Sequence, residues 1–339
     1  MRPPEDPLAG RAKEVLPRYH ETPSAHSASL LSFKTGNAAL PNVRSMTKIG
    51  GFRNPAAEQR YFAAYDRAMA ECPEPARVFD VETRHGSTRV YRYGGEGSPI
   101  ALLPGLMATS ACFAELLPAL ADRHAVYAID TLGEAGRSVH KAPFKDIRDR
   151  ASALDDVFES LELSSVHLVG GSTGGWHAAN QAIHAPGRLA SIALLDATTV
   201  SAPFARKVFR YGLPAALLDS DRLWRRFVTW SAGEDILDQP AAQLVLAGIR
   251  CYRARVPFQV LPSAEALRSI EIPTLALFGG RSAVHDSAAA AARLESLLPH
   301  ADVEILPDAG HYLYLRPEDR DRIIERVLDW AGQAARAPE

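Results

Sequence analysis

A serine lies between glycines at residues 170–174, which read Gly-Gly-Ser-Thr-Gly. The largely apolar run Val166–Val169 precedes them and the helix-compatible run Gly175–Ala179 follows, so the pattern predicts a strand, a sharp turn with Ser172 at its apex, and a helix. The glycines two before and two after the serine allow the backbone to approach itself closely. Such a turn exposes the Ser172 hydroxyl and points the Thr173 N–H at the same space, where a developing oxyanion would be stabilised. This is the chemistry of a serine nucleophile.

An alternation of strands and helices must position that turn. A hairpin is predicted where Val78–Thr83 and Ser87–Tyr93 flank a His-Gly pair. Short, mostly apolar runs follow, typical of strands that are buried on both faces of a mostly parallel sheet. These runs are Ile100–Leu103, Ala125–Ile129, Val166–Val169, Ile192–Leu195, Thr274–Phe278 and Val303–Leu306.

Helical patterns separate these runs, with apolar residues recurring every three or four positions between about residues 113–120, 147–161, 294–298 and 323–328. The predicted fold class is therefore α/β, with a doubly wound, mostly parallel sheet. Ligands of such sheets bind outside the carboxyl ends of the strands, which is where Ser172 would emerge.

One segment interrupts the alternation. Residues 200–268 contain no convincing strand, but they hold many aromatic and aliphatic residues at helix-like spacing. We interpret this segment as a helical cap inserted after the sixth strand, between core segments 46–199 and 269–339. Most of its aromatics are expected to pack inside the cap and a minority to line a substrate pocket, for which we select Trp224 and Trp230.

The first 45 residues differ from the rest, because they are rich in proline and polar residues and have no sustained apolar period. They predict a tail without fixed structure. Met46 follows directly and is an alternative start to Met1, a choice that the sequence leaves open.

Composition excludes several classes of function. The formal net charge is −2, which argues against recruitment by nucleic acid or by an anionic membrane. The three cysteines, Cys72, Cys112 and Cys251, are widely spaced and give neither a disulfide framework nor a zinc site. Without a membrane-spanning run or a signal peptide, we expect a soluble, cytoplasmic protein. No metal or cofactor motif is found, so no cofactor is expected.

Several motifs in a fixed order resemble the α/β-hydrolase fold superfamily over roughly residues 78–333. Residues 170–174 resemble its nucleophile turn, and Leu103-Pro104-Gly105-Leu106 resembles its oxyanion loop, with Pro-Gly in place of the usual His-Gly. Residues 130–138 resemble its Asp-x-x-Gly-x-Gly-x-Ser stretch, with one extra residue between the glycines. Asp308-Ala309-Gly310-His311 resembles its histidine loop.

The resemblance implies roles for single residues. Ser172 would attack an acyl carbon, and His311 would accept its proton and later give it to the leaving group. The N–H groups of Leu106 and Thr173 would form the oxyanion hole. The acid is less clear, because Ser282 stands where the family usually has an aspartate.

Two other carboxylates are candidates for the acid. Asp286 lies four residues beyond Ser282, and it is equally suited to cap the helix that follows. Asp196 ends the sixth predicted strand, where some members of the superfamily place their acid. We favour Asp286 and keep Asp196 as the alternative.

These residues predict a serine hydrolase that cleaves an ester or thioester of a small, largely apolar acyl substrate through an acyl-enzyme on Ser172. Carbon–carbon bond hydrolysis and acyl transfer are alternatives on the same fold. A weakly active ligand-binding pseudoenzyme is an alternative of a different class, because the usual acid is replaced. The substrate's identity and the oligomeric state stay open, a homo-oligomer being one option.

Overall fold

The computed structural model describes residues 48–314 and 316–334 of the 339-residue chain. The predicted tail over residues 1–45 and the alternative start at Met46 lie outside the described residues.

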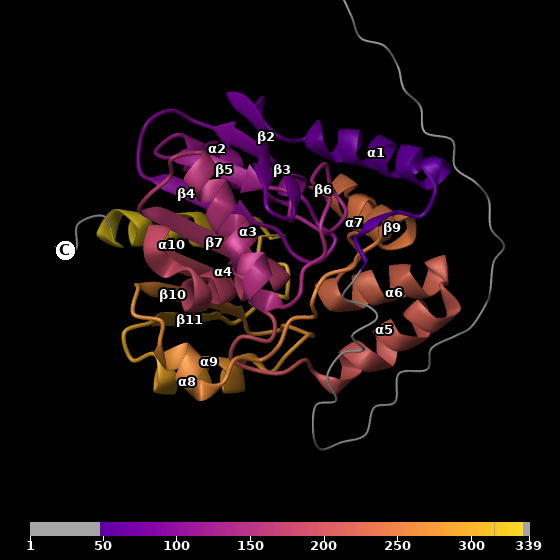
Figure 1. The fold of residues 1–339 in the computed structure, drawn as a ribbon. Helices are drawn as coiled ribbons and strands as arrows, with labels where there is room; N and C mark the ends of the chain where they lie inside the picture. Colours follow the sequence, from indigo (N-terminus) through magenta and orange to yellow (C-terminus); the bar gives the residue numbers. More distant parts are fainter. Residues whose placement is uncertain (1–47, 315, 335–339) are drawn as a thin grey trace, which may run out of the picture. The chain divides into compact units, whose positions relative to one another are not determined.

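A nine-stranded sheet forms the centre of the fold, with strand order β11-β10-β8-β7-β4-β5-β3-β2 and β6 paired with β3 (Figure 1). The pairs from β11 to β5 are parallel, whereas β3 pairs antiparallel with β2, β5 and β6. The strands are β2 (Arg77–Thr83), β3 (Gly86–Tyr93), β4 (Pro99–Leu103), β5 (Ala125–Ile129), β6 (Val139–His140), β7 (Val166–Gly171), β8 (Leu189–Leu195), β10 (Thr274–Gly279) and β11 (Asp302–Leu306). All predicted strands are confirmed, and β8 is the sixth of them.

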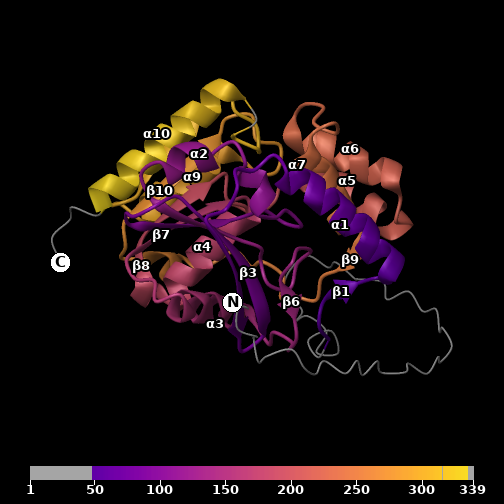
Figure 2. The ribbon, with the colours of Figure 1, turned by 90° about the horizontal axis from the view of Figure 1, so that it is seen from above.

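Helices cover both faces of the sheet, because successive strand residues point to opposite sides. Ile100 and Leu102 of β4 join one core cluster, and Ala101 and Leu103 join the other. Figure 2 shows the sheet between α2 and α10 on one side and α3 and α4 on the other. The core helices are α1 (Pro55–Met69), α2 (Leu117–Ala121), α3 (Ile147–Ser160), α4 (Thr173–His184), α9 (Ser287–Leu297) and α10 (Pro317–Ala334), with short 3₁₀ turns η2 (Ser110–Phe113) and η3 (Pro186–Arg188). The doubly wound α/β fold is confirmed.

The segment between β8 and β10 is mainly helical. It holds α5 (Arg206–Leu218), α6 (Asp221–Ala232), α7 (Pro240–Cys251) and α8 (Ala264–Arg268). It also holds one short strand that the sequence analysis missed, β9 (Tyr252–Arg253), which pairs antiparallel with β1 (Gly51–Phe52). A two-residue strand has too few positions to show an alternating pattern. Figure 1 shows α5 and α6 side by side, and α7 next to α1.

The longest helix, α10, has 18 residues and many charged side chains. Over residues 48–314 and 316–334, no helix is both long and apolar enough to cross a membrane.

Candidate active site

Ser172 occupies a strained turn between β7 and α4. Its φ is 54° and its ψ is −118°, outside the regions that residues with a side chain usually adopt. A Cβ atom on Gly170 would lie 2.1 Å from the Gly174 carbonyl oxygen, and one on Gly174 would lie 2.0 Å from the Leu103 carbonyl oxygen. Only glycine fits at either position, as the sequence pattern predicted. The Ser172 N–H donates to the carbonyl of Leu195 at 2.9 Å, which fixes the turn to β8.

His311 lies in the loop between β11 and α10, with its Nε2 2.9 Å from Ser172 Oγ. The side chain is 5% exposed and so is largely shielded from water. This geometry suits transfer of the serine proton to the imidazole. The structure thus brings together the predicted nucleophile and the predicted base.

The other nitrogen of that imidazole, His311 Nδ1, lies 2.6 Å from Oδ2 of Asp196. Asp196 follows β8 directly, is fully buried and has a positive φ of 43°. The three hydrogen-bonded side chains have the Ser-His-Asp arrangement. In this arrangement the carboxylate fixes the tautomer of the histidine and stabilises the imidazolium.

Asp196 accepts four hydrogen bonds, enough to occupy both of its oxygens. Oδ1 accepts from the Gly279 N–H at 2.8 Å and from His285 Nε2 at 3.0 Å. Oδ2 accepts from Ser282 Oγ at 2.7 Å and from His311 Nδ1. Burial alone would raise the pKa of Asp196, but the hydrogen bonds from His285 and His311 outweigh it and hold that pKa well below the usual range. The carboxylate is therefore charged.

The preference for Asp286 as the acid needs correction. Its Oδ1 accepts the Ala289 N–H at 3.0 Å, as the N-cap of α9, and its side chain is not hydrogen-bonded to His311. The structure brings the alternative, Asp196, to His311 instead. The physical reason is the loop after β10, where Ser282 and His285 turn toward Asp196 and Asp286 points to the start of a helix.

The two predicted oxyanion donors belong to segments that lie next to Ser172. A Cβ atom on Gly105 would lie 3.3 Å from Ser172 Cβ, so the loop that carries Leu106 passes close to the nucleophile. Thr173 is the first residue of α4, and its N–H has no acceptor within the helix. Both positions fit the predicted role.

The two tryptophans selected for substrate binding have different surroundings. Trp224 packs, partly buried, in a cluster that also contains Tyr312, and the ring of Tyr312 lies 5.1 Å from that of His311. Trp230 stacks on Tyr211 with ring centroids 4.7 Å apart, a contact between α6 and α5. Trp224 therefore belongs to a cluster that extends to the neighbour of His311, whereas the contacts of Trp230 are those of a packing residue.

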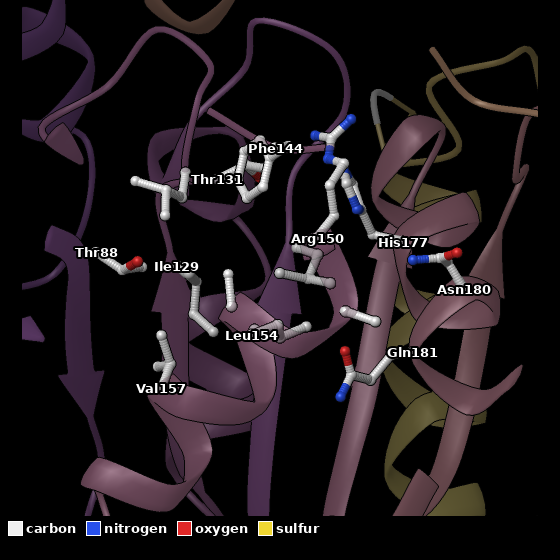
Figure 3. A pocket seen from close by; sticks show the side chains of 14 residues that line it. Thr88, Ile129, Thr131, Phe144, Arg150, Leu154, Val157, His177, Asn180 and Gln181 are labelled. Atoms are coloured by element: carbon white, nitrogen blue, oxygen red, sulfur yellow. The ribbon is translucent and has the colours of Figure 1, made fainter. Parts of the chain in front are cut away.

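A small cavity of about 30 Å³ lies under α3 and α4 (Figure 3). Roughly one or two water molecules fit such a volume, so it is too small for an acyl substrate. Its lining includes Arg150 and His177, which point to the same end of the cavity in Figure 3. Among the described residues, no group of three His, Cys, Asp or Glu side chains is arranged to hold a metal ion.

Two buried residues of this region were not predicted from the sequence. His285 is hydrogen-bonded to Asp196, and Glu134 accepts the Met107 N–H at 2.9 Å, next to Leu106. A lone loop histidine gives no local signal. Glu134 does have one, because it lies in the stretch with the extra residue between the glycines.

Known proteins share this arrangement of elements. Carboxylesterase YbfK of Bacillus subtilis (strain 168) is 30% identical over 280 residues, covering 80% of this chain and 93% of the relative. The crystal structure of carboxylesterase CesB (YbfK) from Bacillus subtilis has a TM-score of 0.74 at 28% identity, covering 81% of this chain and 98% of that one. The crystal structure of naproxen esterase (carboxylesterase NP) from Bacillus subtilis has a TM-score of 0.74 at 26% identity, with 82% and 99% covered.

The family match covers the sheet from β4 to β11 and extends into α10. The description "Alpha/beta hydrolase family" matches residues 100–322, which include Ser172, Asp196 and His311. Fold, site geometry and relatives agree, and the chain belongs to the alpha/beta hydrolase family.

Proposed function

We propose that this protein is a carboxylesterase that hydrolyses a small, largely apolar ester through an acyl-enzyme on Ser172. The observation that carries the proposal is the hydrogen-bonded series from Ser172 Oγ to His311 and on to Asp196. The naming of two relatives as carboxylesterase YbfK and naproxen esterase supports an ester over other acyl compounds.

The first half of the reaction forms the acyl-enzyme. Ser172 Oγ attacks the ester carbonyl while its proton passes to His311 Nε2. The new imidazolium is stabilised by the buried charge of Asp196, and the carbonyl oxygen becomes an oxyanion that the Leu106 and Thr173 N–H groups bind. The tetrahedral intermediate collapses when His311 gives its proton to the leaving alcohol.

The second half releases the acid. His311 takes a proton from a water molecule, which attacks the acyl carbon and passes through a second oxyanion in the same hole. Collapse of this intermediate breaks the bond to Ser172 Oγ, and the proton on His311 returns to the serine. Atoms and protons balance over the cycle without a cofactor.

The helical segment 200–268 acts, in this proposal, as a cap over the site. The end of α6 packs against the histidine loop, since a Cβ atom on Gly310 would lie 2.8 Å from the Ala232 carbonyl oxygen. Trp224 contributes to the wall that contacts the acyl group, because it shares a cluster with Tyr312.

The alternative from another class is a weakly active, ligand-binding pseudoenzyme. That alternative depends on the absence of an acid beside His311, because Ser282 stands where the family usually has an aspartate. Asp196 supplies a buried carboxylate at His311, which removes that premise. Thioester hydrolysis, carbon–carbon bond hydrolysis and acyl transfer would use the same serine, and the screen below compares thioester with ester hydrolysis directly.

The test is a turnover screen over aryl esters and thioesters of increasing acyl length, with fluorophosphonate labelling in parallel. We expect turnover of short aryl esters and rapid labelling, and both should be lost in Ser172→Ala. Labelling without turnover of any acyl compound would favour a binding protein, and no labelling at all would overturn the proposal.

A further inference from the structure

The oxyanion loop has a backbone geometry that must be held in place. Met107 follows Leu106 and has a φ of 57°, in the left-handed region that a residue with a side chain rarely adopts. The loop closes on itself through the Ala108 N–H, which donates to the Gly105 carbonyl at 3.0 Å. Such a strained conformation persists only where surrounding groups stabilise it.

A buried carboxylate provides that stabilisation. Glu134 Oε2 accepts the Met107 N–H at 2.9 Å, and Glu134 is only 1% exposed. Hydrogen bonds to a charged acceptor are roughly twice as strong as bonds between neutral groups. Because Met107 directly follows Leu106, fixing its N–H also fixes the peptide next to the proposed Leu106 donor.

Two further groups fix Glu134 itself. Arg150 Nη2, from α3, donates to Glu134 Oε1 at 2.9 Å, and the two side chains are 4% and 2% exposed. His177 Nε2, from α4, lies 3.9 Å from the same oxygen. Burial alone would raise the pKa of Glu134, but His177 and Arg150 outweigh it and lower that pKa to about 2. Figure 3 shows Arg150 and His177 next to one another.

The position of His177 links two halves of the site. Helix α4 begins immediately after the nucleophile, with Thr173, and His177 lies about one turn further along. Glu134 therefore accepts a hydrogen bond from Met107, in the loop that carries Leu106. It also lies next to His177, on the helix α4 that follows Ser172.

We propose that Glu134 is a positioning residue for the oxyanion hole: its carboxylate holds Met107, and thereby the Leu106 N–H, at a fixed distance from Ser172, while Arg150 holds the carboxylate. The inference rests on the proposed ester hydrolysis. Glu134 lies between Gly133 and Gly136, where this chain has one residue more than the family pattern, and the proposal assigns a role to this stretch.

A single substitution cannot test this role cleanly. Replacing Glu134 alone leaves the Arg150 charge buried without its partner, which strongly destabilises a protein. We therefore compare two double variants that both remove the charge pair. Glu134→Gln with Arg150→Met keeps a neutral acceptor for the Met107 N–H, whereas Glu134→Leu with Arg150→Met has none.

Both double variants should fold, as checked by thermal melting. We expect the Gln variant to keep kcat within a few-fold of wild type and the Leu variant to lose roughly 10- to 100-fold in kcat, with KM nearly unchanged in both. The loss is smaller than the roughly 100- to 1000-fold of deleting an oxyanion donor, because the donor is displaced and not removed. The pH profile of kcat/KM should not move, since His311 and Asp196 are untouched.

Labelling of Ser172 by a fluorophosphonate gives a second readout, because the phosphoryl oxygen uses the same hole. Labelling should slow in the Leu variant in parallel with kcat. Equal kcat and equal labelling in the two folded double variants would overturn the proposal, and so would a loss that follows melting temperature alone. If wild type is labelled but hydrolyses no ester, the proposed function fails, while the labelling rates still decide the role of Glu134.

Discussion

The hydroxyl of Ser282 donates a hydrogen bond to Asp196 Oδ2, the same oxygen that faces His311. Ser282 stands where the family usually has its acid. In this chain its hydroxyl instead orients the carboxylate of Asp196, which follows β8. The carboxylate beside His311 therefore comes from the end of β8 and not from the loop after β10. This relationship makes the assignment of Asp196 directly testable.

Asp196→Asn should lower kcat/KM on an aryl ester by about 10⁴-fold, because the imidazolium loses its counter-charge and the histidine tautomer is no longer fixed. Asp286→Asn should keep near wild-type activity. Steady-state kinetics of both variants decides between the two residues, and a nearly inactive Asp286→Asn with active Asp196→Asn would reverse our assignment. As a control, Asp286→Ala should cost about 1 kcal/mol of stability through loss of the α9 cap.

Ser282→Asp should partly rescue Asp196→Asn. Ser282 Oγ lies 2.7 Å from Asp196 Oδ2, which lies 2.6 Å from His311 Nδ1, so a carboxylate at position 282 is within reach of the imidazole. We expect the double variant to recover roughly 10- to 100-fold of the lost kcat. In the wild-type background the same substitution should lower activity and stability, because two carboxylates would then repel one another. Kinetics and urea unfolding of both variants measure this, and the absence of any recovery would show that the loop cannot present an acid.

His285→Leu should lower kcat by roughly 10-fold with little effect on KM. His285 is buried and donates to Asp196 Oδ1, and hydrogen bonds to charged groups contribute about 1.5–3 kcal/mol. His285→Gln places an amide donor near the same position and should retain most of the activity. Comparison of the two kcat values tests the role, and equal losses in both variants would show that the imidazole matters only for packing.

Gly174→Ala should destabilise the fold by about 3 kcal/mol or more, because the new Cβ would meet the Leu103 carbonyl oxygen and β4 would have to move. Gly332→Ala is the matched control. It lies in α10 with no atom within 4 Å of the added Cβ, so it should be neutral or slightly stabilising. Urea unfolding of both variants gives the comparison, and similar values would contradict the close packing of the elbow.

Acidification should destabilise the protein partly through His177. Burial and the nearby Arg150 lower the pKa of His177 from 6.5 to about 4, so between these values the unfolded chain binds a proton that the folded chain does not. The contribution of neutral His177 to the free energy of unfolding is fully present above pH 6.5 and is lost as the pH falls toward 4. Between pH 7 and pH 4.5, the free energy of unfolding of wild type should fall by roughly 2–3 kcal/mol more than that of His177→Gln. Urea unfolding at both pH values measures this, and parallel losses would contradict it.

The fold was largely predictable from local patterns. Buried strands such as Ala125–Ile129 are short apolar runs, and the turn at Ser172 needs its flanking glycines for steric reasons that the sequence alone conveys. Ser172 and His311 could be predicted as partners because each follows a strand of the predicted sheet in a recognisable motif, and the structure brings the two side chains together. β1, β6 and β9 were not predicted, because a strand of two residues is too short to show an alternating apolar pattern.

The acid was harder to predict than the nucleophile, for a physical reason. Asp286 and Asp196 both follow strands, and only the path of the loop after β10 decides which of them meets His311. Glu134 and Arg150 are 16 residues apart and pair through tertiary packing of α3 against the β5 loop. A pairing of this kind has no signature in a single sequence.

The ladder between β1 and β9 joins residues that precede the α/β sheet to residues that follow α7. With α1 packed on α7, the stretch from Gly51 to Met69 and the stretch from Pro240 to Arg253 form one structural unit although they are far apart in the chain. Tyr252 also packs on the aromatic ring of Phe52, with ring centroids 5.2 Å apart. An exchange of α7 and β9 for another sequence would therefore also have to exchange β1 and α1, because the two stretches are packed on one another.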